Sequence, residues 1–470
     1  MEFWEGFEPV SPTGQYFNSS VLSISVISVL ESEVPINDMQ TMSLVKDLFL
    51  PINPRFSSIM VTDTKGEKQW KRVEVKLEDH VNVPIFPSGL SPTSYDEYLD
   101  DYISRIAMDH FRQSKPLWEI HMFQYPTSNA AGNIIFKLHH ALGDGYSLMG
   151  ALLSCLQRAD NPSLPLKFTS HQRSAPESHN IRSICGTVTR ISSLIYNKIS
   201  DFGWSILKSS FVEDDQTPIR SADEAVEFRP ITISTMRFSL DHIKSIKAKL
   251  GVTINDVITG MIFLGARLYM QEMSYNSSKA DSTGIVLMNT RMVGGYKSVK
   301  EMLKPDSDAP WGNRFGLLHL SIPKFTDFDS SSNPLEFVWK THKLMKKKRN
   351  SLAVLFTSSL LNIMQKLRGP EAAAGYIYKA ISNSSMAISN IRGPVEQMAL
   401  ANHPIKGLYF MSVGIPQSLN ITVMTYMGNV RVSLGSEKDF IDPKKFKLCM
   451  ENAFEMILKA AHELPTREYC

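Results

Sequence analysis

The chain has 470 residues, of which 43% are hydrophobic and 21% are charged, and its formal net charge is +3 at pH 7. This length predicts two domains of about 150–220 residues each, with a connecting segment. The nearly neutral charge and the absence of a long basic run argue against nucleic acid as a partner. The four cysteines are widely spaced, which argues against a disulfide framework or structural zinc and favours a reducing, cytosol-facing environment.

The N-terminal stretch MEFWEGFEPV is acidic and lacks the basic and apolar regions of a secretory signal. The apolar run at 21–30 ends at Glu31 and predicts a buried strand. No uncharged apolar stretch reaches the roughly 18–20 residues that cross a bilayer. Any membrane contact is therefore expected to be peripheral.

The first 165 residues are predicted to mix strands and helices. Residues 57–62 and 70–77 have strand character, and in the second segment apolar residues alternate with charged ones. Ser94 and Glu97 form a capping-box pattern that opens a helix. Its predicted apolar face consists of Tyr95, Leu99, Tyr102, Ile103 and Ile106. A further strand is expected at 133–138.

Residues 161–229 are rich in turn-forming and polar residues, which predicts an interdomain linker between domains at 1–160 and 230–470. Within the linker, 184–207 has the pattern of an amphipathic helix. Such a helix packs across two domains or lies on a membrane surface, and the pattern does not separate these alternatives.

The second half begins with a predicted strand at 231–240 and a helix at 240–250, capped by Ser239 and stopped by Gly251. Thr253 and Asp256 make a capping signature for an apolar helix. A strand is expected at 284–291.

A basic run at 344–350 precedes an apolar helix predicted at 351–367, which Gly369 and Pro370 terminate. The lysines fit a solvated helix face. Beside an apolar helix they also suit anionic lipid headgroups or the phosphates of a nucleotide-like carrier.

The stretch HHALGDG (139–145) stands between an apolar strand and a helix rich in small residues. A histidine at such a strand end is placed to act as a general base, and we predict this role for His140. For His139, a structural role is as good an explanation as a catalytic one. Asp144 either orients the imidazole or pairs with an arginine and braces the loop.

Other chemistries find little support in the sequence. It has no GxSxG and no cysteine in a reactive setting, so a nucleophilic enzyme residue is not expected. We expect no metal, because adjacent histidines do not easily converge on one ion. The chain also lacks GxxxxGK[ST] and a strand-embedded GxGxxG. The chemistry that remains is base catalysis, in which the enzyme removes a proton from a bound nucleophile.

HHALGDG resembles the HHxxxDG signature of the acyl-CoA-dependent acyltransferase superfamily. PLWEIH (116–121), TINDVITG (253–260), MNTR (288–291) and SNIRGP (389–394) are similar to motifs of the bifunctional wax ester synthase/diacylglycerol acyltransferases. EPVSPTGQYF (8–17) is similar to the N-terminus of their plant branch. The resemblance covers nearly the whole chain.

The resemblance implies an α/β fold of two chloramphenicol-acetyltransferase-like domains with a substrate tunnel at their interface. It implies that His140 is the general base and that Arg291 pairs with Asp144, which favours the bracing role. Gly145 matches a close-packing glycine. Asn255 and Asp256 match a motif pair, for which we expect a role in shaping the tunnel or assisting an oxyanion.

The implied activity is transfer of a long-chain acyl group from acyl-CoA to a long-chain alcohol or to diacylglycerol. No covalent intermediate and no cofactor beyond the acyl-CoA co-substrate are expected. The implied location is the cytosolic face of the endoplasmic reticulum membrane, with peripheral or weak attachment, and the plasma membrane as a second site. Alternatives are an acyltransferase of the same type with another hydroxyl or amine acceptor, and a non-catalytic lipid-binding protein of the same fold.

Overall fold

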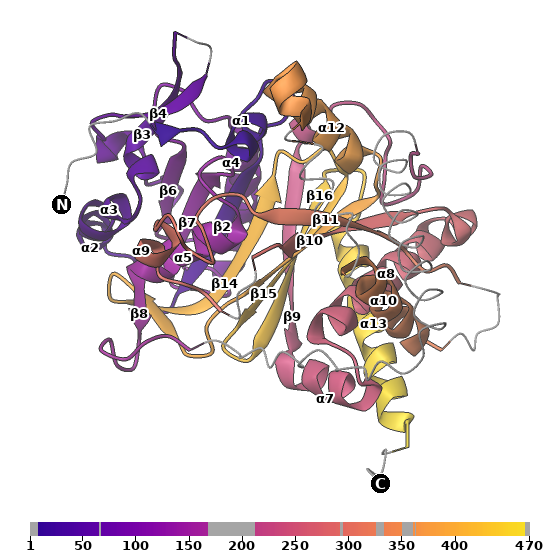
Figure 1. Cartoon of the computed structure of the whole chain (residues 1–470). Helices are drawn as coiled ribbons and strands as arrows, with labels where there is room; N and C mark the ends of the chain where they lie inside the picture. Colours follow the sequence, from indigo (N-terminus) through magenta and orange to yellow (C-terminus); the bar gives the residue numbers. More distant parts are fainter. Residues whose placement is uncertain are drawn as a thin grey trace, which may run out of the picture.

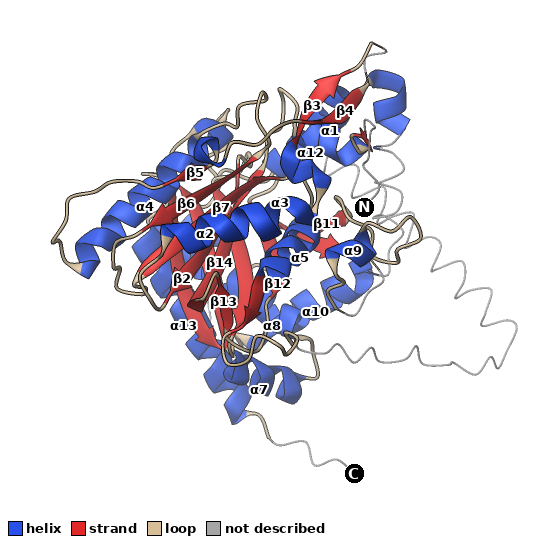
Figure 2. Ribbon diagram, turned by 90° about the vertical axis from the view of Figure 1, so that its left-hand side faces the viewer, coloured by secondary structure: helices blue, strands red, loops and turns tan. Residues whose placement is uncertain are grey.

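Two β-sheets lie side by side in the computed structural model, each with helices packed against it (Figures 1 and 2). The structure describes residues 8–64, 67–167, 212–291, 295–325, 333–349, 361 and 363–465. The predicted α/β class with two sheet-containing halves is confirmed.

The first sheet has the strand order β5-β6-β7-β2-β14-β13-β8. Its central strands are nearly fully buried and supply apolar side chains to both faces. Helix α4 covers one face, while α5 and the segment that begins with α2 pack against the other. The strands are β2 (Ser25–Ser32), β5 (Val81–Asn82), β6 (Trp118–Phe123), β7 (Gly132–His139), β8 (Leu156–Arg158), β13 (Met398–Leu400) and β14 (His403–Val413). The helices of this half are α1 (Pro12–Phe17), α2 (Asp38–Leu44), a π-helix (Val45–Phe49), α3 (Leu50–Ile52), α4 (Pro92–Met108) and α5 (Gly145–Cys155).

The second sheet has the order β11-β10-β12-β15-β16-β9 and is covered by α7, α8, α10 and α13. Its strands are β9 (Ile231–Ser239), β10 (Thr283–Asn289), β11 (Phe315–Ser321), β12 (Met386–Arg392), β15 (Leu419–Tyr426) and β16 (Asn429–Glu437). Its helices are α7 (Leu240–Leu250), α8 (Ile254–Met273), α10 (Leu335–Arg349), α12 (Pro370–Ser382) and α13 (Pro443–Glu463). The short helix α9 (Val299–Met302) packs against α5 in the first half. A small third sheet joins β1 (Glu8–Pro9), β4 (Lys68–Arg72) and β3 (Ser58–Thr62).

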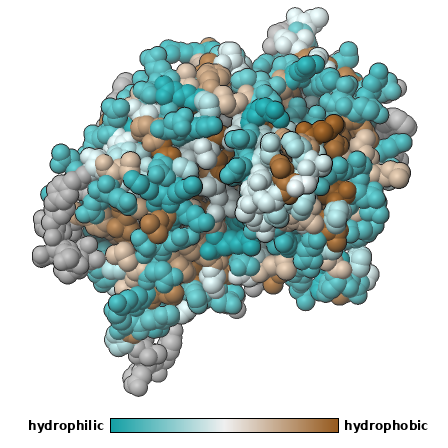
Figure 3. Space-filling model, turned by 180° about the vertical axis from the view of Figure 1, so that it is seen from behind, coloured by the Kyte–Doolittle hydropathy of each residue, from teal (hydrophilic) through white to brown (hydrophobic). Residues whose placement is uncertain are grey.

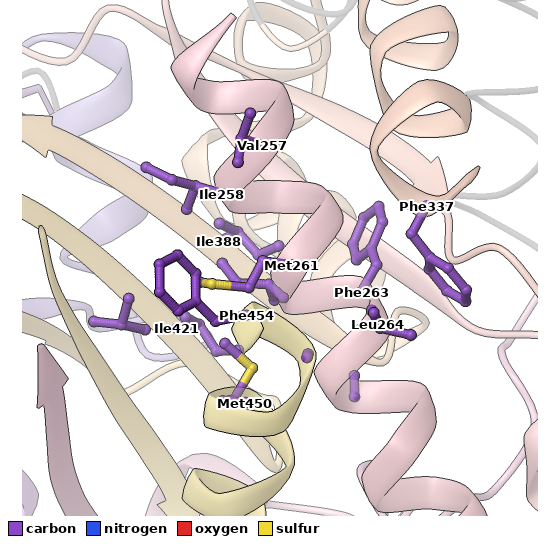
Figure 4. Close-up of a cluster of buried hydrophobic side chains, with 14 of the residues drawn as sticks. Val257, Ile258, Met261, Phe263, Leu264, Phe337, Ile388, Ile421, Met450 and Phe454 are labelled. Carbon is purple, nitrogen blue, oxygen red and sulfur yellow. The ribbon is translucent and has the colours of Figure 1, made fainter. Parts of the chain in front are cut away.

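Helix α8 forms the centre of the larger core. Its side chains pack between β12 and β15 on one side and α10 and α13 on the other (Figure 4). The predicted capping box is present, since the Thr253 hydroxyl accepts from the Asp256 amide and the Asp256 carboxylate accepts from the Thr253 amide. Helix α7 also starts after Ser239 and ends at Gly251, whose φ of +66° suits a residue without a Cβ atom.

Two local predictions need correction. Helix α4 begins at Pro92 with Ser91 as its N-cap, rather than at the predicted Ser94 and Glu97 pair. Proline at the first helical position and a Ser91 hydroxyl that accepts from the Ser94 amide account for the earlier start. The five predicted apolar positions are all buried. The strand expected at 70–77 ends at Arg72, where its pairing with β3 stops.

The two sheets do not divide the chain at one point. Strands β13 and β14 belong to the range predicted as the second domain, yet β14 pairs with β2 in the first sheet. The predicted domain limits 1–160 and 230–470 therefore do not account for β13 and β14, which lie in the second range but belong to the first sheet.

The helix predicted at 184–207 lies outside the described residues, as does most of the helix predicted at 351–367. The basic run begins within α10, and Gly369, with a φ of +83°, directly precedes α12.

None of the described helices is, by itself, long and apolar enough to span a bilayer. Helices α7 and α8 meet that criterion only together, with a bend of 102° between them. In Figure 3, hydrophobic side chains occur on the rear surface as separate patches among hydrophilic ones.

Candidate active site

His140 lies in the turn between β7 and α5. Its backbone amide donates to the carbonyl oxygen of Ile24 over 2.9 Å, so the chain is held beside β2 as it leaves the sheet. Asp144 then caps α5, because its carboxylate accepts from the amide of Ser147. The HHALGDG motif is therefore a strand end, a buried turn and a helix start.

The His140 imidazole is buried and contacts residues far away in sequence. Its Nδ1 lies 2.8 Å from Oδ1 of Asn313, and its ring centroid is 4.9 Å from that of Phe17 and 5.6 Å from that of Phe315. Burial lowers the pKa of His140, while the nearby Asp144 charge partly opposes that change. The imidazole is therefore neutral near pH 7, which is the form that accepts a proton.

His139 is the last residue of β7 and contacts a different set of residues from His140. Its Nδ1 accepts from the amide of Ala141, and its Nε2 lies 3.1 Å from the Ser23 hydroxyl, so both ring nitrogens have partners. Burial lowers the pKa of His139 to about 3. These contacts support the structural explanation for His139, which fixes the turn that presents its neighbour.

Asp144 and Arg291 form the ion pair that the sequence resemblance implies. Nη1 of Arg291 donates to Oδ2 of Asp144 over 2.7 Å, and the arginine side chain is fully buried. Arg291 also donates to the carbonyl oxygens of Pro310 and Gly312 and lies over the Tyr146 ring. Since His140 Nδ1 faces Asn313 rather than the carboxylate, the contacts favour a brace over a catalytic triad.

Gly145 marks a close approach between the two halves. A Cβ atom there would lie 2.6 Å from Cδ1 of Ile391 in β12. A side chain at this position would therefore require the Ile391 side chain to move. The close-packing glycine that the resemblance implies has this physical cause.

His140 lines a cavity of about 380 Å³ between the two halves of the molecule. Its walls come from α1, β10, β11, α12 and the segment 311–314. Most of the lining is apolar, including Tyr16, Phe17, Ile285, Leu287, Phe315 and Ile377. Because Nδ1 is taken by Asn313, Nε2 is the ring nitrogen left for a molecule in this cavity.

Asn255 and Asp256 do not line this cavity. Asn255 accepts a 2.7 Å hydrogen bond from Asn390, so the predicted pair and the SNIRGP segment meet at the start of α8. Asp256 completes the capping box of α8 with Thr253, and its carboxylate lies 2.8 Å from Nδ1 of His342 in α10. These contacts hold α8 to its neighbours, and the predicted tunnel or oxyanion role stays a prediction.

Several residues around His140 could not be identified from the sequence. Asn313, Gly312, Ser147 and the aromatic pair of Phe17 and Phe315 carry no chemical signature by themselves. Two signals were available in the sequence: the EPVSPTGQYF stretch contains α1, which lines the cavity, and PWGN (310–313) combines proline, glycine and asparagine shortly before β11.

Family models match most of the chain. Residues 49–258 match the wax ester synthase/diacylglycerol acyltransferase catalytic domain, and residues 311–458 match the C-terminal domain of the same family. Among solved structures, the wax ester synthase/diacylglycerol acyltransferase from Marinobacter aquaeolei VT8 has a TM-score of 0.60 at 17% identity, covering 97% of this chain and 100% of that chain. The starter condensation domain of rhizomide synthetase has a TM-score of 0.53 at 10% identity, covering 97% and 95%. At these identities, both show the fold alone.

Two relatives from Arabidopsis thaliana extend the match over nearly the full length. Wax ester synthase/diacylglycerol acyltransferase 4 is 30% identical over 91% of this chain and 85% of its own. Wax ester synthase/diacylglycerol acyltransferase 11 is 30% identical over 97% of this chain and 96% of its own. Together with the catalytic and C-terminal domain matches, they show that the chain belongs to the wax ester synthase/diacylglycerol acyltransferase family.

Proposed function

We propose that this acyltransferase moves a long-chain acyl group from acyl-CoA to the hydroxyl of a long-chain alcohol or of diacylglycerol, with His140 as the general base. The observation that carries the proposal is a neutral, oriented histidine in the wall of a mainly apolar cavity between two sheets. The names of the relatives supply the two acceptor classes.

In the proposed reaction, Nε2 of His140 removes the hydroxyl proton as the oxygen attacks the thioester carbonyl carbon. The tetrahedral intermediate then collapses, the carbon–sulfur bond breaks, and the thiolate of CoA takes the proton from Nε2. The products are an ester and free CoA. The exchange needs no change of oxidation state, so the proposal includes no cofactor besides the acyl-CoA co-substrate.

Positioning is expected to contribute more than proton transfer. Holding two reactants in line is worth roughly 7–11 kcal/mol, whereas a general base typically contributes about 10²–10⁴-fold in rate. The cavity supports such positioning because its walls come from both halves, with α1 and His140 on one side and β10, β11 and α12 on the other.

The activity is tested with purified full-length protein and radiolabelled long-chain acyl-CoA, offered equimolar hexadecanol and diacylglycerol in mixed micelles. We expect release of CoA together with a labelled wax ester, triacylglycerol or both, resolved by thin-layer chromatography. A labelled product formed with a different hydroxyl or amine acceptor would show that the proposed acceptor class is wrong. Lipid binding without any acyl transfer would identify a non-catalytic lipid-binding protein and contradict the proposal.

We further propose that the protein attaches peripherally to a membrane beside the cavity, with the cytosolic face of the endoplasmic reticulum as its location. Leu361 lines the cavity, and the helical residues that follow it carry two strongly exposed apolar side chains, Ile363 and Leu367, which are 54% and 79% exposed. They are four positions apart and so share a face of the helix. The exposed Lys366 and Arg368 lie beside them and suit anionic headgroups.

The membrane surface is tested by flotation with vesicles of phosphatidylcholine containing phosphatidylserine. The double variant Ile363→Glu/Leu367→Glu is expected to float less than the parent, because two apolar contacts become charges that anionic lipids repel. Met39→Glu/Leu48→Glu is the matched control, since these side chains are 82% and 49% exposed on the segment that begins with α2. Equal flotation of both double variants, or no flotation of the parent, would remove this surface from the proposal.

A further inference from the structure

Asn313 makes two reciprocal hydrogen bonds with His140. Oδ1 of Asn313 lies 2.8 Å from Nδ1 of the imidazole, and Nδ2 of Asn313 donates to the backbone carbonyl oxygen of His140 over 2.9 Å. The second bond decides how the amide is oriented. A carbonyl oxygen only accepts, so the NH₂ group must face it, and a flipped amide would bring two oxygens together.

This orientation also decides the tautomer of His140. With Oδ1 facing Nδ1, the imidazole must carry its proton on Nδ1 and donate to Asn313. Nε2 then holds the lone pair on the side left for the cavity. The opposite tautomer would place two acceptors 2.8 Å apart and leave Nε2 unable to accept a proton.

The backbone on either side of Asn313 is fixed by residues of the HHALGDG helix start and by Arg291. The amide of Arg314 donates to Oδ2 of Asp144, and the carbonyl oxygen of Gly312 accepts from Nη2 of Arg291. The Ser147 hydroxyl contacts both the amide and the carbonyl oxygen of Gly312, at 3.1 and 3.0 Å. Gly312 has a φ of +120°, a conformation that side chains rarely adopt.

From this arrangement we infer that Asn313 is a positioning residue through which the ion pair of Asp144 and Arg291 controls the tautomer of the base. Asp144 makes no hydrogen bond with the imidazole in the described structure. It holds the segment 312–314, and that segment holds Asn313 against His140. The inference rests on the proposed function, because it assigns a role relative to the proposed base.

The charge of residue 313 matters because other titratable groups surround the base. The ion pair of Asp144 and Arg291 lies at the start of α5, and His139 directly precedes His140 in the sequence. The cavity that His140 lines is also lined by Tyr16, Arg314 and His319. Asn313 is neutral, so it orients the ring without adding a second negative charge that would favour the imidazolium form. A carboxylate at this position would raise the pKa of His140.

Two substitutions at 313 test the inference through steady-state kinetics at several pH values. Asn313→Leu keeps the approximate size and removes both hydrogen bonds, and we expect kcat to fall by about 10²-fold or more with little change in KM, since a wrong tautomer cannot act as the base. Asn313→Asp retains an acceptor for Nδ1, and we expect measurable activity with the acid limb of kcat/KM displaced by about one pH unit or more toward higher pH.

The link to the motif is tested with Ser147→Ala, alone and combined with Asn313→Leu. Loss of the Ser147 hydroxyl removes two of the hydrogen bonds that hold Gly312, so kcat should fall in the parent background but change little once residue 313 no longer orients the ring. Ser154→Ala is the matched control, because this hydroxyl lies in the same helix and, among the described residues, donates to the Gly150 carbonyl oxygen within that helix. Its kcat should equal that of the parent.

The possible results distinguish failure of this inference from failure of the proposed function. Parental kcat in folded Asn313→Leu, an unshifted pH profile in Asn313→Asp, or equal effects of Ser147→Ala in both backgrounds would overturn the inference. Should the leucine variant not fold, the Asn313→Asp profile and the Ser147→Ala effect decide. Parental activity in His140→Ala would instead contradict the proposed function. If His140→Ala is inactive but the variants at residue 313 behave like the parent, only the inference about Asn313 fails.

Discussion

Replacement of His140 by alanine is expected to lower kcat for ester formation by about 10²–10⁴-fold, the contribution of a general base. The substrates would still be held between the two sheets, so KM should change much less than kcat. The buried Nδ1 contact is lost and Oδ1 of Asn313 is left without that partner, which costs about 1–3 kcal/mol of stability. The measurement is CoA release under saturating acyl-CoA, together with thermal unfolding to establish that the variant is folded.

His242→Ala provides the control for this experiment. His242 is exposed on α7 and does not line the cavity, so its removal should leave both kcat and the unfolding midpoint at parental values. A folded His140→Ala protein with parental kcat would contradict the assignment of the base.

Breaking the buried ion pair is expected to have the largest effect on stability. Arg291→Ala leaves the Asp144 carboxylate without its cation and frees the carbonyl oxygens of Pro310 and Gly312, and we expect a loss of about 3–5 kcal/mol in the free energy of unfolding. Asp144→Asn should also destabilise, because it leaves a buried guanidinium without a counter-charge. Both variants should lose kcat as well.

The two substitutions are expected to differ in one respect. Asparagine is a good N-cap, so Asp144→Asn keeps an acceptor for the Ser147 amide and preserves the start of α5. Chemical unfolding of both variants beside the parent measures the difference, and Arg291→Ala should unfold at the lowest denaturant concentration. Parental midpoints in both would refute the bracing role.

Local sequence patterns predicted much of the fold because the physics that decides these elements is local. The caps at Ser239 and Thr253 and the stop at Gly251 depend on residues a few positions apart, and the structure contains each of them. The error at α4 arose where two serines competed as caps, and proline at the first helical position favoured Ser91. The early end of β4 depends on its partner strand, which no local pattern reveals.

The site was predictable to a different extent. HHALGDG locates the base and its motif aspartate because both lie on one turn, and the family resemblance supplied Arg291. Asn313 contacts His140 across 173 positions of sequence, and its neighbours are ordinary glycine, tryptophan and arginine. Only the folded chain brings such residues together, so their roles could not be inferred from spacing.

The position of β14 in the first sheet has a consequence for folding during synthesis. β14 lies between β2 and β13 in that sheet, so the sheet is completed only after residues 403–413 have been synthesised. Until then the emerging chain exposes the edge of β2, with its unpaired amides and carbonyl oxygens and its apolar side chains. The first sheet therefore cannot be completed before most of the chain has been synthesised, and a gene fragment ending near residue 160 encodes a sheet without one of its central strands.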